Sequence, residues 1–136
     1  MTIPPGRHRL RLRVLPGRLV LCRLEPHAAF PAWASGDGLV CVTRTAEELS
    51  VVCPEGRVPS DVRQIGGYVA IGVEGPLAPE LVGVLASMAT PLADASIPIV
   101  AIGTFDTDYV LVRAADLDHA LQTLRQAGHT IASGGS

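Results

Sequence analysis

The second half of the chain shows two kinds of hydrophobic pattern, continuous apolar runs and helical repeats. Uninterrupted apolar runs at residues 68–73, 97–102 and 110–112 have the length of short strands. A helical repeat follows the first run, and its apolar positions share one face: Leu77, Leu81, Val84, Leu85 and Met88. Proline lacks the N–H that a helix interior uses, so we expect this helix to start near Pro79 and to end or kink at Pro91.

A second helix and a short last strand complete this half. Residues 115–127 repeat with helical spacing, Gly128 is the expected C-cap, and 130–132 predict a strand before a frayed end at 133–136. The apolar face of this helix holds three residues: Leu117, Leu121 and Leu124. The order β-α-β-β-α-β predicts an α+β, ferredoxin-like unit, in which a four-stranded antiparallel sheet carries two helices on one face.

The first half has strand patterns but few helical ones. Residues 9–14 alternate strictly, which predicts an edge strand with three arginines on its solvated face: Arg9, Arg11 and Arg13. Further strands are expected at 18–24, 39–43 and 49–53, with a short helix near Trp33, a packing anchor. The Gly- and Pro-rich stretch 54–67 is the best internal boundary. We therefore expect two tandem units, residues 1–66 and 67–136, of which the first is a degenerate copy of the second.

Composition and charge exclude several classes of protein. The chain has 136 residues, of which 48% are hydrophobic and 18% charged, enough for one compact domain or two small ones. Its net charge of -2 and its 4% aromatic content disfavour nucleic-acid binding, since RNA-recognition sheets stack bases on aromatic residues. No apolar stretch approaches the length of a membrane span. We expect a cytoplasmic protein that binds neither membranes nor nucleic acids.

The cysteines and histidines indicate no catalytic or metal chemistry. Cys22, Cys41 and Cys53 lie in apolar strand patterns without a C-x-x-C pair, and buried free thiols suit a reducing cytoplasm. The chain has no Asn, which disfavours small ferredoxin-like phosphatases, and no nucleophile elbow or phosphate loop. All four histidines are expected at the surface: His8, His27, His119 and His129. We predict no enzyme, no metal site and no cofactor.

The turn between the last two apolar runs is the best candidate for a binding site. Asp and Thr are ordinary turn formers, so a purely structural turn is the alternative. A binding site there would combine Asp106 and Asp108, which can face an ammonium or guanidinium group, with free helix N–H groups at 78–81, which can hold a carboxylate. Together these groups suit a zwitterion such as an amino acid.

Three segments, residues 73–77, 91–93 and 97–112, resemble the ACT-domain family, in its branch related to the CASTOR arginine sensors. The Thr-Phe-x-x-Asp core at 104–108 is the most specific part, and a weaker similarity extends through 22–24, Trp33 and 43–50. The resemblance implies regulatory binding of an amino acid or similar small effector where ACT units meet, without catalysis.

The resemblance also implies the residues of the ligand site. The matching positions lie on the hairpin and on the first helix: Thr104, Phe105, Asp106, Thr107 and Asp108, with Glu80, Leu81, Val82 and Leu85. The arginine sensors have four ACT units in one chain and this chain holds two at most, so a homodimer is expected. The alternative is a protein-interaction or oligomerisation module whose ligand site is empty.

Overall fold

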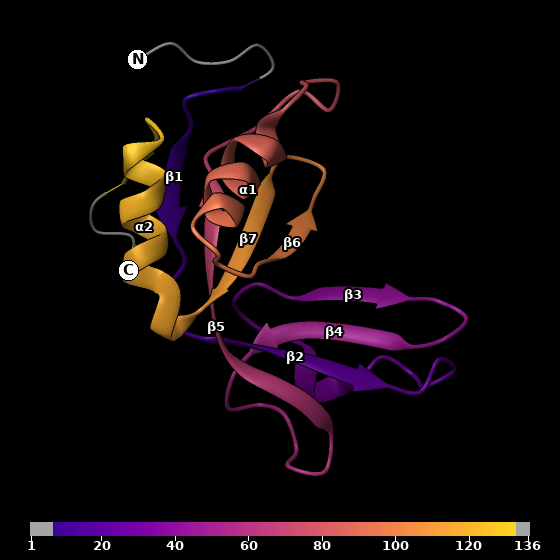
Figure 1. Cartoon of the computed structure of the whole chain (residues 1–136). Coiled ribbons are helices and arrows are strands. Elements are labelled where there is room, and N and C mark those ends of the chain that lie inside the picture. The colour runs from indigo at the N-terminus through magenta and orange to yellow at the C-terminus, as the bar shows by residue number, and fades with distance from the viewer. Residues whose placement is uncertain (1–6, 133–136) are drawn as a thin grey trace. The chain divides into compact units, whose positions relative to one another are not determined.

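The structure is a computed structural model that describes residues 7–132 (Figure 1). The described chain divides into two compact units: residues 17–68 form one, and residues 7–16 with 69–132 form the other. The break between residues 68 and 69 lies close to the expected boundary at 66 and 67. The first strand, however, belongs with the C-terminal unit. The frayed end expected at 133–136 lies outside the described residues.

The C-terminal unit is a mixed α+β unit with five strands and two helices. The strands are β1 (Arg11–Val14), the second part of β5 (Arg63–Val73), β6 (Val100–Gly103), β7 (Asp108–Arg113) and β8 (Thr130–Ile131). The helices are α1 (Val84–Asp94) and α2 (Leu117–Gln126), the latter preceded by the 3-10 turn η2 (Ala114–Asp116). From β5 onward the order is β-α-β-β-α-β, which confirms the predicted ferredoxin-like fold.

Strand β1 is inserted into this sheet, which has the order β6-β7-β5-β1-β8. It pairs antiparallel with β5 and parallel with β8, so it lies inside the sheet and the expectation of a solvated edge strand is wrong. Leu10 and Leu12, which alternate with the arginines, are buried in the core, and this burial holds the strand inside the sheet.

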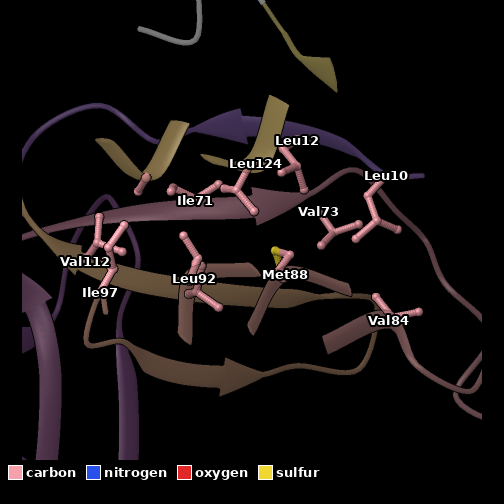
Figure 2. Close-up of a cluster of buried hydrophobic side chains, with 12 residues drawn as sticks. Leu10, Leu12, Ile71, Val73, Val84, Met88, Leu92, Ile97, Val112 and Leu124 are labelled. Carbon is pink, nitrogen blue, oxygen red and sulfur yellow. The ribbon is translucent and has the colours of Figure 1, made fainter. Parts of the chain in front are cut away.

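One hydrophobic core fills the space between this sheet and both helices (Figure 2). Ile71 and Val73 of β5 contact the same cluster as Met88 and Leu92 of α1 and Leu124 of α2. The two helices also pack against each other, so both cover the same face of the sheet (Figure 1). This confirms the predicted arrangement of helices on one face.

Helix α1 begins later than its hydrophobic pattern predicts. Gly83 is its N-cap and has a left-handed backbone with φ 89°, so the helix cannot extend back to Leu77 through this residue. The Leu77 N–H instead donates to the Asp106 carbonyl at 2.7 Å, in a loop that covers residues 74–83. At the other end, α1 continues through Pro91 to Asp94, so proline does not end it.

A buried histidine compensates for the proline inside α1. Pro91 has no N–H to donate to the carbonyl of Ser87, one turn earlier in the helix. His129 Nε2 bonds that carbonyl at 2.8 Å, and His129 Nδ1 accepts the Leu10 N–H at 3.0 Å. Because a carbonyl only accepts, Nε2 is the ring nitrogen that carries a proton toward Ser87, and Nδ1 is the acceptor. His129 is 4% exposed, so its predicted surface location is wrong. The C-cap of α2 is Ala127, and Gly128, which was predicted as the C-cap, is the next residue and has a left-handed backbone with φ 100°.

The regular secondary structure of the N-terminal unit is almost entirely β-strand. These are β2 (Leu19–Leu24), β3 (Cys41–Arg44), β4 (Leu49–Pro54) and the first part of β5, with the 3-10 turn η1 (Ala32–Ala34) after β2. The antiparallel order β3-β4-β2-β5 is the order of a ferredoxin-like sheet, with η1 and the loop 55–62 in place of the two helices. That this unit is a degenerate copy of the other stays a prediction.

The core of this unit holds Trp33 and two of the three cysteines. Trp33 packs against a buried cluster that includes Cys22 and Cys53, as expected of a packing anchor. Cys41 is only partly buried, which differs from the prediction of three buried thiols. Strand β5 starts earlier than its apolar run, at Arg63, because its exposed polar residues pair with β2.

Candidate functional site

The hairpin between β6 and β7 has a tight tip at residues 104–107. Gly103 and Asp108 are the last paired residues, and the Thr104 N–H donates to the Thr107 carbonyl at 2.8 Å. The Thr104 hydroxyl donates to the same carbonyl at 3.0 Å and accepts the Thr107 N–H at 3.2 Å. Thr104 therefore shapes the tip through its side chain, as threonine does in many turns.

The tip is anchored on the loop that follows β5. Besides the bond from Leu77 to the Asp106 carbonyl, the Thr107 hydroxyl donates to the Val73 carbonyl at 2.6 Å. A Cβ atom placed on Gly75 would lie 2.9 Å from the Asp106 carbonyl oxygen, which is closer than real side chains approach. Glycine at residue 75 therefore lets the two loops come together.

A hollow of about 520 Å³, here called the helix-side hollow, lies beside the first turns of α1. Asp108 is the only charged residue among those that line it: Leu81, Gly83, Val84, Leu85, Ala86, Ala89, Thr90 and Asp108. Because the Ser87 N–H makes the first bond of the helix, to the Gly83 carbonyl at 2.9 Å, the N–H groups of Val84 to Ala86 have no partner within the helix. A carboxylate thus borders the same hollow as the positive end of a helix dipole.

A second hollow of about 420 Å³, the sheet-side hollow, lies on the other face of the hairpin. Successive residues of a strand point to opposite faces, so Asp108 lines the first hollow and Tyr109 the second. The lining residues come from β1, the end of β5, the following loop and the hairpin: Arg13, Val73, Glu74, Gly75, Pro76, Asp106, Thr107 and Tyr109.

The structure divides the predicted ligand residues between the two hollows. Leu81, Leu85 and Asp108 line the helix-side hollow, whereas Asp106 and Thr107 line the sheet-side hollow. The remaining four are absent from both linings: Glu80, Val82, Thr104 and Phe105. The expectation of free helix N–H groups at 78–81 is wrong, because α1 begins at Val84 and those residues form a loop.

Arg13 and Tyr109 line the sheet-side hollow, and sequence reasoning named neither as a candidate. The strict alternation of residues 9–14 placed Arg13 on one face of a strand, but gave no partner for that strand. Its pairing with β5 joins residues far apart in sequence, Arg13 opposite Gly72, and brings the guanidinium group to the hairpin.

The N-terminal unit offers a smaller hollow and two unreactive thiols. A hollow of about 200 Å³ has both basic and acidic residues in its lining, including Arg23, Glu48 and Arg63. Burial, with a smaller contribution from the nearby Cys53, raises the pKa of Cys22 to about 11. Burial also raises the pKa of Cys53. Neither thiol is therefore poised for nucleophilic chemistry near neutral pH.

Between residues 7 and 132, no three His, Cys, Asp or Glu side chains gather where they could hold a metal ion. None of the helices in that range combines the length and apolar character needed to cross a bilayer.

Comparison with known proteins shows which family the chain belongs to. Residues 65–126 match the family model of the ACT domain, and residues 17–61 match a model described as an N-terminal domain. The protein Atu0741 from Agrobacterium tumefaciens is 40% identical, with a TM-score of 0.87 over 92% of this chain and 93% of that one. The chain belongs to the same family as Atu0741. No curated protein matches it.

Two more distant structures share the fold. VC0802 from Vibrio cholerae, described as a protein of unknown function and possible transport protein, is 22% identical with a TM-score of 0.71 over 88% of this chain and 90% of that one. The ligand-free regulatory subunit of aspartate kinase from Thermus thermophilus is 15% identical with a TM-score of 0.57 over 83% and 93%. The specific similarity to the arginine-sensor branch stays a prediction.

Proposed function

We propose that this protein is a non-catalytic regulatory protein of the cytoplasm that binds an amino acid or similar small effector on its ACT domain. The observation that carries the proposal is the helix-side hollow, where Asp108 borders the same space as the first turn of α1. The ACT family match and the shared fold of a regulatory subunit of aspartate kinase support the regulatory role.

The hollow has complementary groups for a zwitterion. Helix N–H groups and the helix dipole attract a carboxylate, and the Asp108 carboxylate attracts an ammonium or guanidinium group. Apart from Thr90, the remaining lining is apolar and can contact the side chain of an effector through Leu81, Leu85 and Ala89. A volume of about 520 Å³ falls within the usual range for small-molecule sites, roughly 300–1,000 Å³.

A second copy of the chain is proposed to complete the site. Leu81 and Leu85 border the hollow and are 43% and 39% exposed, and Val82 beside them is 74% exposed. Apolar side chains gathered around an open hollow gain stability when a partner covers them. A homodimer formed over this face would place the effector between two ACT domains, and effector binding would then strengthen the dimer.

Exposed apolar side chains also favour a second candidate function, a protein-interaction module whose ligand site is empty. Phe105 at the hairpin tip is 90% exposed, which is unusual for an aromatic side chain without a partner. Such a module would bind a partner protein through the tip and would not respond to small effectors.

A thermal-shift screen against amino acids, nucleotides and common metabolites distinguishes the two functions. A ligand at 100 times its dissociation constant stabilises the folded protein by about 2.7 kcal/mol, whereas an interaction module gains nothing. Hits are repeated on Asp108→Asn and on Asp61→Asn, a matched control at an exposed position outside the hollow. A shift that disappears only in Asp108→Asn supports the effector site, and an equal shift in both variants removes Asp108 from it.

A further inference from the structure

The sheet-side hollow brings unlike charges together from three distant parts of the chain. Arg13 comes from β1, Glu74 from the end of β5 and Asp106 from the hairpin tip. Arg13 is present because β1 is inserted between β5 and β8, a strand that the β-α-β-β-α-β unit by itself does not contain. The cation of this hollow is thus a consequence of the added strand.

Gly72, which has no side chain, lies between two of the side chains that line the sheet-side hollow. Arg13 lies opposite Gly72 on the neighbouring strand. A Cβ atom on Gly72 would lie 2.8 Å from Cε1 of Tyr109, so the Tyr109 ring lies directly over this glycine. Glycine at residue 72 therefore lets the phenol ring and the guanidinium group flank the same stretch of backbone.

The charges of the hollow are only partly compensated within the described chain. Arg11 Nε lies 2.8 Å from the Glu74 carboxylate, so a neighbouring cation already balances Glu74. Among residues 7–132, neither the Arg13 guanidinium nor the Asp106 carboxylate has a hydrogen bond or ion pair. The two groups without partners carry opposite charge and line the same space of about 420 Å³.

We propose that the sheet-side hollow is a second binding site, for a small zwitterion that places its carboxylate on Arg13 and its ammonium group at Asp106. Guanidinium groups bind carboxylates through two parallel hydrogen bonds, which favours Arg13 as the carboxylate partner. An anion without an amine meets repulsion from Asp106, and an amine without a carboxylate meets repulsion from Arg13. The site goes beyond the proposed effector site, because it lies on the opposite face of the hairpin.

The test is an NMR titration of the full chain with each of the twenty amino acids at millimolar concentrations. For each amino acid that binds, the matching carboxylic acid without the amine and the matching amine without the carboxylate are titrated as well. Amide signals of Gly75 and Tyr109 report the sheet-side hollow, and those of Leu85 and Ala89 report the helix-side hollow. We expect an intact amino acid to shift the first pair and to bind more tightly than either fragment.

Single substitutions test whether Arg13 and Asp106 each contribute to binding at the sheet-side hollow. Arg13→Gln and Asp106→Asn should each weaken binding at this hollow by about 10- to 100-fold, the range for a lost charged hydrogen bond. Arg125→Gln, a matched change on the exposed face of α2, should leave it unchanged. Asp108→Asn should leave it unchanged as well, since Asp108 lines the other hollow.

Three outcomes would overturn this proposal. They are the absence of shifts at Gly75 and Tyr109 with every amino acid, unchanged affinity in Arg13→Gln, and equal affinity for the acid that lacks the amine. Binding that depends on Asp108 alone would leave the proposed effector site standing while this second site fails. Binding that depends on Arg13 and Asp106 but not on Asp108 would support this second site, while the proposed effector site fails.

Discussion

Replacement of His129 by alanine should destabilise the C-terminal unit strongly. The change removes the acceptor for the Leu10 N–H and the donor for the Ser87 carbonyl, which are held at 3.0 and 2.8 Å. A buried polar group left without a partner costs about 1–3 kcal/mol, so the two together cost about 2–6 kcal/mol. Domains of this size have total stabilities of about 5–15 kcal/mol, so the variant should be marginally folded.

Equilibrium unfolding in urea measures this loss directly. His119→Ala is the matched control, because His119 is exposed on α2 and should change stability by less than about 0.5 kcal/mol. A loss below about 1 kcal/mol in His129→Ala would refute the reasoning, since it would mean that the Leu10 and Ser87 groups find other partners.

A double-mutant cycle with Pro91 tests whether His129 stabilises the protein by replacing the N–H that this proline lacks. Alanine at residue 91 restores an N–H that can bond the Ser87 carbonyl within α1, so this carbonyl no longer depends on His129. The cost of His129→Ala should then fall by about 1–3 kcal/mol in the Pro91→Ala background. An additive cycle would show that the proline and the histidine do not compensate each other.

Three further predictions concern the hairpin and the thiols. Gly75→Ala should lower the free energy of unfolding in urea by about 1–3 kcal/mol, because its Cβ would press on the hairpin backbone. In the control Gly103→Ala the nearest atom is 3.4 Å away, so the loss should be less than half as large. Equal losses in the two variants would refute the close contact at Gly75. In the native protein a thiol reagent should modify Cys41 quickly and Cys22 and Cys53 only after unfolding, which mass spectrometry of the labelled peptides would check. The pKa of Cys22 is raised from 9.0 to about 11 on folding. This thiol therefore contributes stability below pH 9 that is lost as the pH rises to about 11. A free energy of unfolding that does not decline across that pH window would contradict this prediction.

Local periodicity in the sequence determined the secondary structure where each element depends on its own residues. Strand β7 and helix α2 lie close to their predicted ranges, because an uninterrupted apolar run marks a strand that is buried on both faces and a period-3.6 pattern marks the helix face that meets the core. The resemblance in the Thr-Phe-x-x-Asp segment likewise indicated the ACT domain that the family comparison supports. The hairpin was also predicted as the focus of the site, and both hollows border it.

Tertiary structure decided the features that depend on residues far apart in the chain. Helix α1 starts at Val84 because Gly83 adopts a left-handed backbone and the hairpin takes the Leu77 N–H. His129 is buried because α1 contains a proline whose missing N–H it replaces. Arg13 reaches a hollow because β1 pairs with β5. The sequence by itself reveals which face of an element is apolar, but hydrogen-bond partners and charge neighbours form only when the core brings distant segments together.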